Sequence, residues 1–477
     1  MNDKSFCPVL IRAAVGACII LVAGCSVDQR KEVATYRKVI DANQPAAVRV
    51  APGAVVTLTD ALALANQNEE RLAIQGETYL QALIDKDRAF VAFLPTVNLA
   101  PSYQLASVGN ATFGATSHQT QVPVNAQANL FNGFRDYHAL KAAEAGIEQQ
   151  KQLVLDLQQT VLLDVAQTYY QILASEQSVE VLTNSLAVQR ARVQNIQAQA
   201  KVGTARPLDV AQAQAQLSAT QVSLNSARAD VLNGRSLLAY LVDAPIEDNP
   251  LRDDYEPPAD LAPLAGWQAQ AEAGRQDLLA AAAAVKSARE NVEVAFGQYY
   301  PSVDLNLNYQ LYDEALSGGG AWTGLLSLNL PIFTGGLIEA NVRTAWSQFR
   351  QAALTQAQLR RQIDQIVETA YVNLDLARRQ LRELQVEVEA ARQALYLADQ
   401  LYHAGNGTLL DVLIAQDTLL STQLQLTTEQ FTQKTAYFNL LRTVGTLKLQ
   451  MTSATRPSQQ HIRELATQPT TIPTTRP

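Results

Sequence analysis

Cys25 is the residue of this sequence whose surroundings point most directly to covalent chemistry. Lys4 and Arg12 supply positive charge, the run from Ala13 to Ala23 is almost wholly small or apolar, and Val22-Ala23-Gly24-Cys25 closes it. This order is typical of a secretory signal. Its ending resembles a bacterial lipobox, in which the cysteine thiol takes a diacylglyceryl group. We expect residues 1–24 to be a signal peptide and Cys25 to be the lipidated N-terminus, although an ordinary signal peptide with a chance cysteine would look similar.

Other residue types that carry catalysis or bind metals are few and scattered. The four histidines are His118, His138, His403 and His461, and they form no HExxH pattern. The segment Gly405–Gly407 is too short to be a phosphate-binding loop. With Cys7 and Cys18 inside the signal, no thiol pair is left for a disulfide. We therefore expect no catalytic residue, no metal site and no cofactor, and the chain is not expected to be an enzyme.

Composition argues against a nucleic-acid partner and against helical membrane spans. The net charge is −8, and no dense block of lysine and arginine occurs. The longest apolar stretch, Leu278 to Val285, is far shorter than the ~20 residues that a spanning helix needs. If the chain spans a membrane, it must do so as a closed β-barrel, which satisfies its own backbone hydrogen bonds.

Two segments repeat at a constant offset of 202 residues, the separation of Leu130 and Ile332. Leu130-Phe131-Asn132-Gly133 matches Ile332-Phe333-Thr334-Gly335. Further along, Gly203, Leu208, Asp209, Val210, Ala213 and Gln214 match Gly405, Leu410, Asp411, Val412, Ala415 and Gln416. Constant spacing without insertions predicts rigid intervening elements and an internally duplicated chain.

Long amphipathic helices are predicted between the repeated motifs. Residues 134–200 and 337–402 contain no proline, and apolar residues recur every three or four positions. One heptad seam consists of Leu384, Val388, Ala391, Leu395, Ala398 and Tyr402. A glycine turn and a fresh helix start follow each long helix, so we expect two αα-hairpins with tips near residues 203 and 405.

Four runs alternate apolar and polar residues and predict strands at about 96–108, 119–131, 302–312 and 321–333. Their length suits a tilted strand that crosses a bilayer. A half-buried soluble sheet would show the same alternation, but the amide-rich polar faces and the lipidation signal favour a barrel with a wet lumen. Four strands cannot close a barrel, and open edges in lipid are costly, so two or more copies must share one.

The predicted organisation has six parts. They are a signal peptide (1–24), a lipidated N-terminal segment (25–58), a first repeat (59–242), a proline-rich linker (243–263), a second repeat (264–448) and a disordered tail (449–477). Each repeat begins with a shorter helix, at about 59–93 and 264–300.

Two stretches carry a resemblance to a known family. Leu330-Pro331-Ile332-Phe333-Thr334-Gly335-Gly336 and the tip from His403 to Gln416 resemble the TolC-type outer-membrane efflux proteins, over about residues 58–448. Cys25 is similar to the lipidated cysteine of the lipoprotein members. The resemblance implies an α+β homotrimer with four strands per chain in one transmembrane β-barrel, a long periplasmic α-helical coiled barrel and a mixed collar. The collar would take the N-terminal segment, the linker and the region after Thr446.

The resemblance also implies a function and partners. The chain would be the outer-membrane exit duct of a tripartite efflux or secretion system, of the kind that serves RND-type pumps. Its partners would be further copies of itself, a periplasmic adaptor, an inner-membrane transporter and outer-membrane lipid. Drug, metal and protein export share this outer component, and the sequence does not separate them.

Site residues follow from the same resemblance. Asp411 matches an acid of the periplasmic gate, and Tyr402 matches an aromatic residue that holds the closed state. Ile414 stands where family members often have a second acid, and Gly407 stands in place of a basic partner, for which Arg206 could substitute. Asp209 is the acid of the first tip. The predicted adaptor-docking residues are Val202, Gly203, Thr204, Ala404, Gly405 and Asn406.

Structural explanations compete with these roles. Asp209 and Asp411 stand near helix starts, where acids stabilise the helix dipole. Tyr402 continues a heptad seam, as a core residue would. The whole chain could instead be a lipid-anchored periplasmic coiled-coil adaptor or scaffold, but four amphipathic strands of membrane length in two matched pairs count against that alternative.

Overall fold

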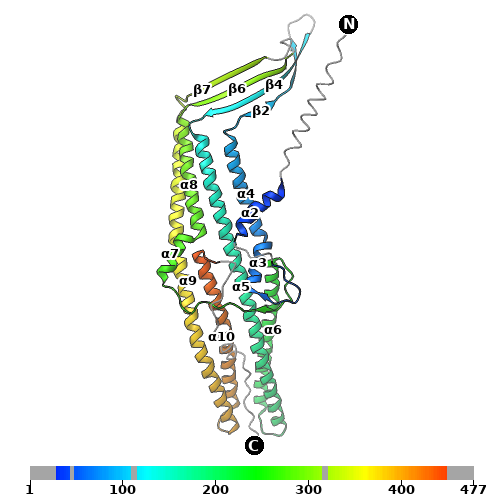
Figure 1. Ribbon diagram of the computed structural model, residues 1–477. Coiled ribbons are helices and arrows are strands. Elements are labelled where there is room, and N and C mark those ends of the chain that lie inside the picture. The colour runs from blue at the N-terminus through cyan, green and yellow to red at the C-terminus, as the bar shows by residue number, and fades with distance from the viewer. Residues whose placement is uncertain (1–27, 43–47, 109–114, 314–320, 448–477) are drawn as a thin grey trace, which may run out of the picture.

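Two long helical hairpins form most of the chain, and Figure 1 shows them side by side below a small sheet. The computed structural model describes residues 28–42, 48–108, 115–313 and 321–447. The long helices α5 (Arg135–Lys201) and α9 (Leu337–His403) have 67 residues each, and the returning helices α6 (Pro207–Val242) and α10 (Leu409–Val444) have 36 each. Both long helices lie within one residue of their predicted bounds. At 1.5 Å per residue each is about 100 Å long.

The shorter helices differ from the prediction, because each is broken. Each predicted continuous helix is a pair: α3 (Leu58–Asn68) with α4 (Glu70–Val91), and α7 (Leu264–Gly274) with α8 (Gln276–Phe296). The breaks fall at Glu69 and Arg275, which are extended with ψ of 117° and 124°. A one-turn 3₁₀ helix, Gly297–Tyr299, follows α8.

Tertiary contacts explain both breaks. The Asn68 side chain donates to the carbonyls of Val242 and Asp243, where α6 ends. The buried Arg275 guanidinium donates to the carbonyl of Thr443 in the last turn of α10. Each break therefore joins a short helix to the end of a returning helix and supplies donors for its carbonyls.

The sheet is antiparallel and stands at one end of the helices (Figure 1). Its strands are β2 (Thr96–Leu99), β3 (Ser102–Val108), β4 (Ala115–Phe131), β6 (Ser302–Asp313) and β7 (Trp322–Asn329). β2 and β3 both pair with β4, β4 pairs with β6, and β6 pairs with β7.

Proline modifies two of the predicted strands. The first is interrupted at Ala100 and Pro101, where the ladder loses an N–H donor. The fourth ends at Asn329 rather than at residue 333, since Pro331 follows, and Ile332 and Phe333 are exposed outside the sheet. In the described residues, β2 with β3 forms one edge of the sheet and β7 forms the other.

The N-terminal segment has structure that the sequence did not indicate. It contains α2 (Gln29–Ile40) and β1 (Val56–Thr57), and β1 pairs in parallel with β5 (Leu251–Arg252) of the linker. Tyr169 on α5 fixes this junction, because its hydroxyl donates to the carbonyls of Val56 and Arg252 at 2.9 and 2.8 Å. Cys25 and the predicted signal and tail lie outside the described residues.

The linker runs across all four hairpin helices (Figure 1), near the middle of α5 and α9 and near the C-terminal ends of α6 and α10. One side chain from each helix donates to its carbonyls. These pairs are Arg235 of α6 with Glu247 and Asn249, Tyr169 of α5 with Arg252, Lys434 of α10 with Tyr255, and Arg378 of α9 with Pro258 and Ala259. The linker thus forms a belt that fixes the order α6, α5, α10, α9.

Candidate functional site

Each hairpin ends in a tight turn built on one glycine, and these two tips are the candidate site. Gly203 and Gly405 have φ of +81° and +76°. A Cβ on either would meet nothing within 4 Å, so the backbone conformation rather than space requires glycine. All six predicted adaptor-docking residues are exposed here: Val202, Gly203, Thr204, Ala404, Gly405 and Asn406.

Asp411 at the second tip is exposed, and its carboxylate caps its own helix. Oδ2 accepts hydrogen bonds from the hydroxyl and the backbone N–H of Thr408 at 2.7 and 2.8 Å, and the Asp411 N–H donates back to Thr408 Oγ1 at 3.3 Å. These bonds lower the pKa of Asp411, the side-chain bond from Thr408 most. Asp411 therefore caps the start of α10, and its ionised carboxylate remains at the surface.

Asp209 at the first tip is largely covered and paired. Arg206 Nη2 lies 2.7 Å from Asp209 Oδ1, Arg206 Nε lies 3.1 Å from Oδ2, and the Arg206 backbone N–H donates to Oδ2 at 3.2 Å. The side-chain hydrogen bond from Arg206 chiefly lowers the pKa of Asp209. Arg206 thus pairs with Asp209 at the start of α6, within its own tip. The carboxylate of the first tip is therefore neutralised by a cation, whereas the Asp411 carboxylate of the second tip is bonded to uncharged Thr408.

Tyr402 lies where the two tips meet. It packs against an apolar cluster that contains Leu409 and Leu413 of α10 together with Val193 and Ile196 of α5. It also packs against the apolar seam within the second hairpin. Its half-buried ring therefore has the contacts of a core residue at the junction between hairpins.

Gly407 has a local packing reason for carrying no side chain. A Cβ there would lie 3.1 Å from both Leu401 Cβ and the Tyr402 backbone nitrogen, closer than ordinary contact. A basic residue at this position would require the turn to shift by a few tenths of an ångström.

The structure adds an ion pair that sequence reasoning missed. Arg192 of α5 lies 3.4 Å from Asp399 of α9, with only 13% and 5% of the two side chains exposed. Burial lowers the pKa of Arg192, and the charge of Asp399 opposes that shift. Asp399 Oδ2 also lies 3.4 Å from His403 Nε2. The i,i+4 spacing of Asp399 and His403 was a visible signal, but Arg192 lies 207 residues from Asp399 in the chain.

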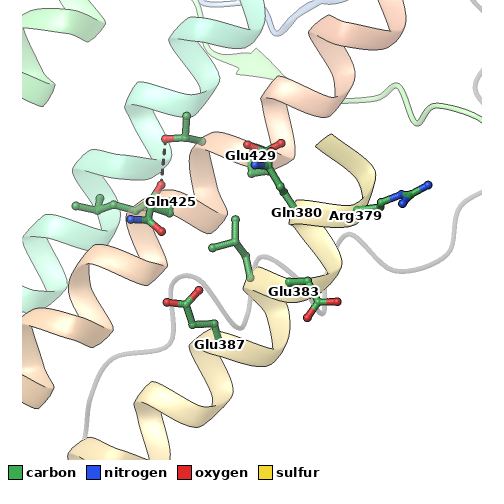
Figure 2. A pocket seen from close by; sticks show the side chains of 9 residues that line it. Arg379, Gln380, Glu383, Glu387, Gln425 and Glu429 are labelled. Carbon is green, nitrogen blue, oxygen red and sulfur yellow. Dashed lines mark hydrogen bonds between the residues drawn. The ribbon is translucent and has the colours of Figure 1, made fainter. Parts of the chain in front are cut away.

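A groove lies between α9 and α10 above the tips (Figure 2). Its acidic lining residues are Glu383, Glu387 and Glu429, and burial raises the pKa of Glu429. Arg379 points away from these carboxylates and pairs with Asp375 at 2.7 Å. Within the described residues, no group of three or more His, Cys, Asp or Glu side chains is arranged to hold a metal ion. No helix in the described part of the chain is long and apolar enough to cross a membrane.

Comparisons with known proteins agree on one family. Residues 61–242 and 267–446 match the family model described as outer membrane efflux protein. The outer membrane efflux protein BepC of Brucella suis is 28% identical over 341 residues, which are 69% of this chain and 74% of BepC. The outer membrane protein TolC of Escherichia coli is 23% identical over 397 residues, 77% of this chain and 79% of TolC.

The fold matches solved structures as well. The open state of the MtrE outer membrane channel of Neisseria gonorrhoeae superposes with a TM-score of 0.70 at 19% identity, over 84% of this chain and 94% of MtrE. Because the family model covers well over half of the 477 residues, in two segments that carry both hairpins, the chain belongs to the outer membrane efflux protein family.

Proposed function

We propose that this chain is the outer-membrane exit duct of a tripartite efflux system and that it works as a homotrimer. The observation that carries the proposal is a single antiparallel sheet with the strand order β2/β3–β4–β6–β7, an edge on each side and helices of about 100 Å below it. Exposed apolar side chains occupy both edges, for example Leu105 and Leu328. A membrane sheet with open edges is costly, so neighbouring copies are expected to complete a shared barrel.

We further infer that the chain is internally duplicated. Equal helix lengths, 67 and 36 residues in each hairpin, support this inference. The glycines at the matched positions Gly133 and Gly335 have positive φ of +71° and +63°. The two tip glycines also have positive φ. Duplication gives each subunit two similar hairpins, so three subunits would present six tips around one axis.

The exposed tips are the proposed docking surface for a periplasmic adaptor. Val202 is 75% exposed and lies beside Gly203 and Thr204, and the second tip presents the matched Ala404 and Gly405. The adaptor would connect the duct to an inner-membrane transporter, which would supply the energy. Export then needs no catalytic residue or cofactor in this chain.

Asp411 is the proposed gate carboxylate. It is exposed and its hydrogen bonds favour the ionised form, so three copies near one axis would attract cations and repel anions. Asp209 differs because Arg206 neutralises it. Tyr402 is proposed to hold the second tip against the first through the cluster at their junction.

Cys25 is the proposed lipid anchor at the outer membrane. Fractionation tests the anchor and the barrel together. The exit duct predicts a heat-modifiable trimer in outer-membrane detergent extracts, for the native chain and for Cys25→Ser. A lipid-anchored adaptor or scaffold predicts that Cys25→Ser releases the protein into the soluble periplasmic fraction.

A further inference from the structure

The helix α2 carries a row of exposed cations that export through the duct does not use. Arg30, Lys31 and Lys38 are all exposed, and within the described ranges no ion pair involves their side chains. Steps of one and seven residues along a 3.6-residue helix place the three on one face, with the exposed Ala34 between them. We call these three residues the cationic row.

The opposite face of α2 is packed against the body of the chain. Tyr36 and Ile40 are 4% and 1% exposed. The Tyr36 ring lies against Gly76 of α4, and the Ile40 carbonyl accepts a hydrogen bond from Gln158 of α5 at 2.8 Å. Glu32, four residues before Tyr36, belongs to this packed side. The exposed face therefore keeps its positive charge.

α2 runs antiparallel to α4, so its start points toward the sheet (Figure 1). Asp41, just after α2, accepts a hydrogen bond from Asn66, which precedes α4. Tyr36, five residues earlier, already contacts Gly76 inside α4. Moving back along α2 is thus moving up α4, toward Val91 and the first strand.

The length of chain before α2 fixes how far the proposed lipid lies from the cations. Seven residues of helix separate Tyr36 from Gln29, a rise of about 10 Å. Four more residues lead back to Cys25, a span of at most about 14 Å. From Gly76 to Val91, α4 rises about 22 Å. A lipid on Cys25 therefore reaches the end of α4, and its short tether keeps the first turn of α2 close beneath.

The end of α4 has the side chains of a membrane interface. Phe90, Val91, Phe93 and Leu94 are 52%, 51%, 45% and 49% exposed, immediately before the sheet. Aromatic residues gather at the level of lipid headgroups. This level agrees with the reach of Cys25, so two independent features place the headgroups just above the start of α2.

We propose that α2 binds anionic phospholipid headgroups of the leaflet that holds the lipid on Cys25, through Arg30, Lys31 and Lys38. Basic residues beside a lipid chain add electrostatic attraction to the anchor, and their long side chains extend toward the headgroups. Lys38 lies about 10 Å farther from the membrane than the first turn and contributes least. The inference rests on the proposed lipid-anchored duct and names the lipid class that it contacts.

A probe at the centre of the cationic row tests the contact. Cys25 is the last cysteine of the chain and its thiol would carry the lipid, so Ala34→Cys offers one reactive thiol for a fluorophore. The labelled full chain is inserted into vesicles of phosphatidylcholine with or without phosphatidylglycerol. Quenching by acrylamide, which is uncharged, should fall roughly two-fold when the anionic lipid is present. High salt should restore it, because salt screens the attraction.

Charge variants identify the residues responsible. Arg30→Gln/Lys31→Gln should remove most of the dependence on phosphatidylglycerol, and Lys38→Gln should remove less. Arg190→Gln/Arg228→Gln is the matched control, since it removes two exposed cations from the first hairpin, far below the sheet. A lipid dependence that survives Arg30→Gln/Lys31→Gln, or that the control pair also removes, would contradict the assignment.

The outcomes separate this inference from the proposed function. If the chain does not float with the vesicles, the outer-membrane duct fails. If it floats and the Ala34→Cys probe is quenched equally in both kinds of vesicle, the lipid contact alone fails, including the case in which a neighbouring copy covers the cationic row. A probe at Val202→Cys, at the first tip, should not respond to lipid, and an equal response there would overturn the contact.

Discussion

Tyr169 and Tyr170 are consecutive, fully buried residues of α5, and only the hydroxyl of Tyr169 has hydrogen-bond partners in the described chain. Their rings meet edge to face with centroids 5.7 Å apart. Tyr169 points into the junction of β1 with β5, whereas Tyr170 packs on Phe438 of α10. Tyr169 therefore holds the linker belt by hydrogen bonding, whereas Tyr170 holds the two hairpins together by aromatic packing.

Phenylalanine substitutions should have opposite effects at these two positions. Tyr169→Phe removes hydrogen bonds to the carbonyls of Val56 and Arg252 and should cost about 1–3 kcal/mol of unfolding free energy. Tyr170→Phe removes a buried hydroxyl without a partner and should leave stability equal or higher. Denaturant unfolding of the two variants in detergent measures both, and equal losses would contradict the assignment.

Alkaline pH should destabilise the protein. Burial raises the pKa of Tyr169, Tyr170 and Tyr255, whereas the same groups titrate near 10 in the unfolded chain. The unfolded state then loses protons that the folded state keeps, so stability falls as pH rises above about 10. Burial also lowers the pKa of Lys434, which acts in the opposite direction, but only up to the unfolded lysine pKa near 10.4, above which the tyrosines alone change the stability.

The measurement is the midpoint of thermal unfolding between pH 8 and pH 11. It should stay level until the unfolded tyrosines begin to ionise and then fall. Tyr170→Phe should flatten the fall. A midpoint that does not change up to pH 11 would show that these hydroxyls ionise equally in both states.

Lys434 should be a strong determinant of stability. Its side chain is 7% exposed, pairs with Asp253, donates to the Tyr255 carbonyl at 2.6 Å and lies 5.5 Å from the Tyr170 ring centroid. Lys434→Met leaves the Asp253 carboxylate without this cation and should cost about 3–5 kcal/mol. The control is Lys286→Met, an exposed lysine of α8, which should change stability little. If Lys434→Met lowers the unfolding free energy no more than the control does, Lys434 does not hold the linker belt against α10.

Much of this architecture could be predicted because the helices are long and locally encoded. Heptad spacing and the absence of proline predict both long helices within one residue of their bounds, and the tip glycines predict where each hairpin turns. The breaks at Glu69 and Arg275 could not be predicted, because their causes are contacts with residues far away in the chain, Val242 and Thr443. The end of the last strand before Pro331 had a local signal that the alternation of apolar residues masked.

Some features of the candidate site could likewise be predicted from the sequence, and others could not. The position of Asp411 near a helix start could be predicted from the sequence, and the structure adds its hydrogen bonds with Thr408. Whether Asp411 also lines a gate stays a prediction. The pair Arg192–Asp399 joins residues of different repeats, so no local pattern could reveal it.

The selectivity of the channel should depend on the charge of Asp411 and not on its capping role. Asp411→Asn removes the charge and should weaken cation preference and block by divalent cations. Thr408→Ala removes the partner of the cap, weakening the helix start by about 1 kcal/mol, and leaves the charge in place. Single-channel recordings of both variants compare the roles, and equal selectivity in Asp411→Asn and the unmodified channel would refute a carboxylate ring.

The most direct test of the duct is the mass of the particle extracted from outer membranes. In the proposed barrel, strands of neighbouring copies complete the sheet edges at β2/β3 and β7, and the proposed homotrimer closes it with three chains. Native mass spectrometry of the detergent-extracted protein should therefore give three chain masses and no stable monomer. A folded monomer, or protein found only in the soluble periplasmic fraction, would contradict the shared barrel.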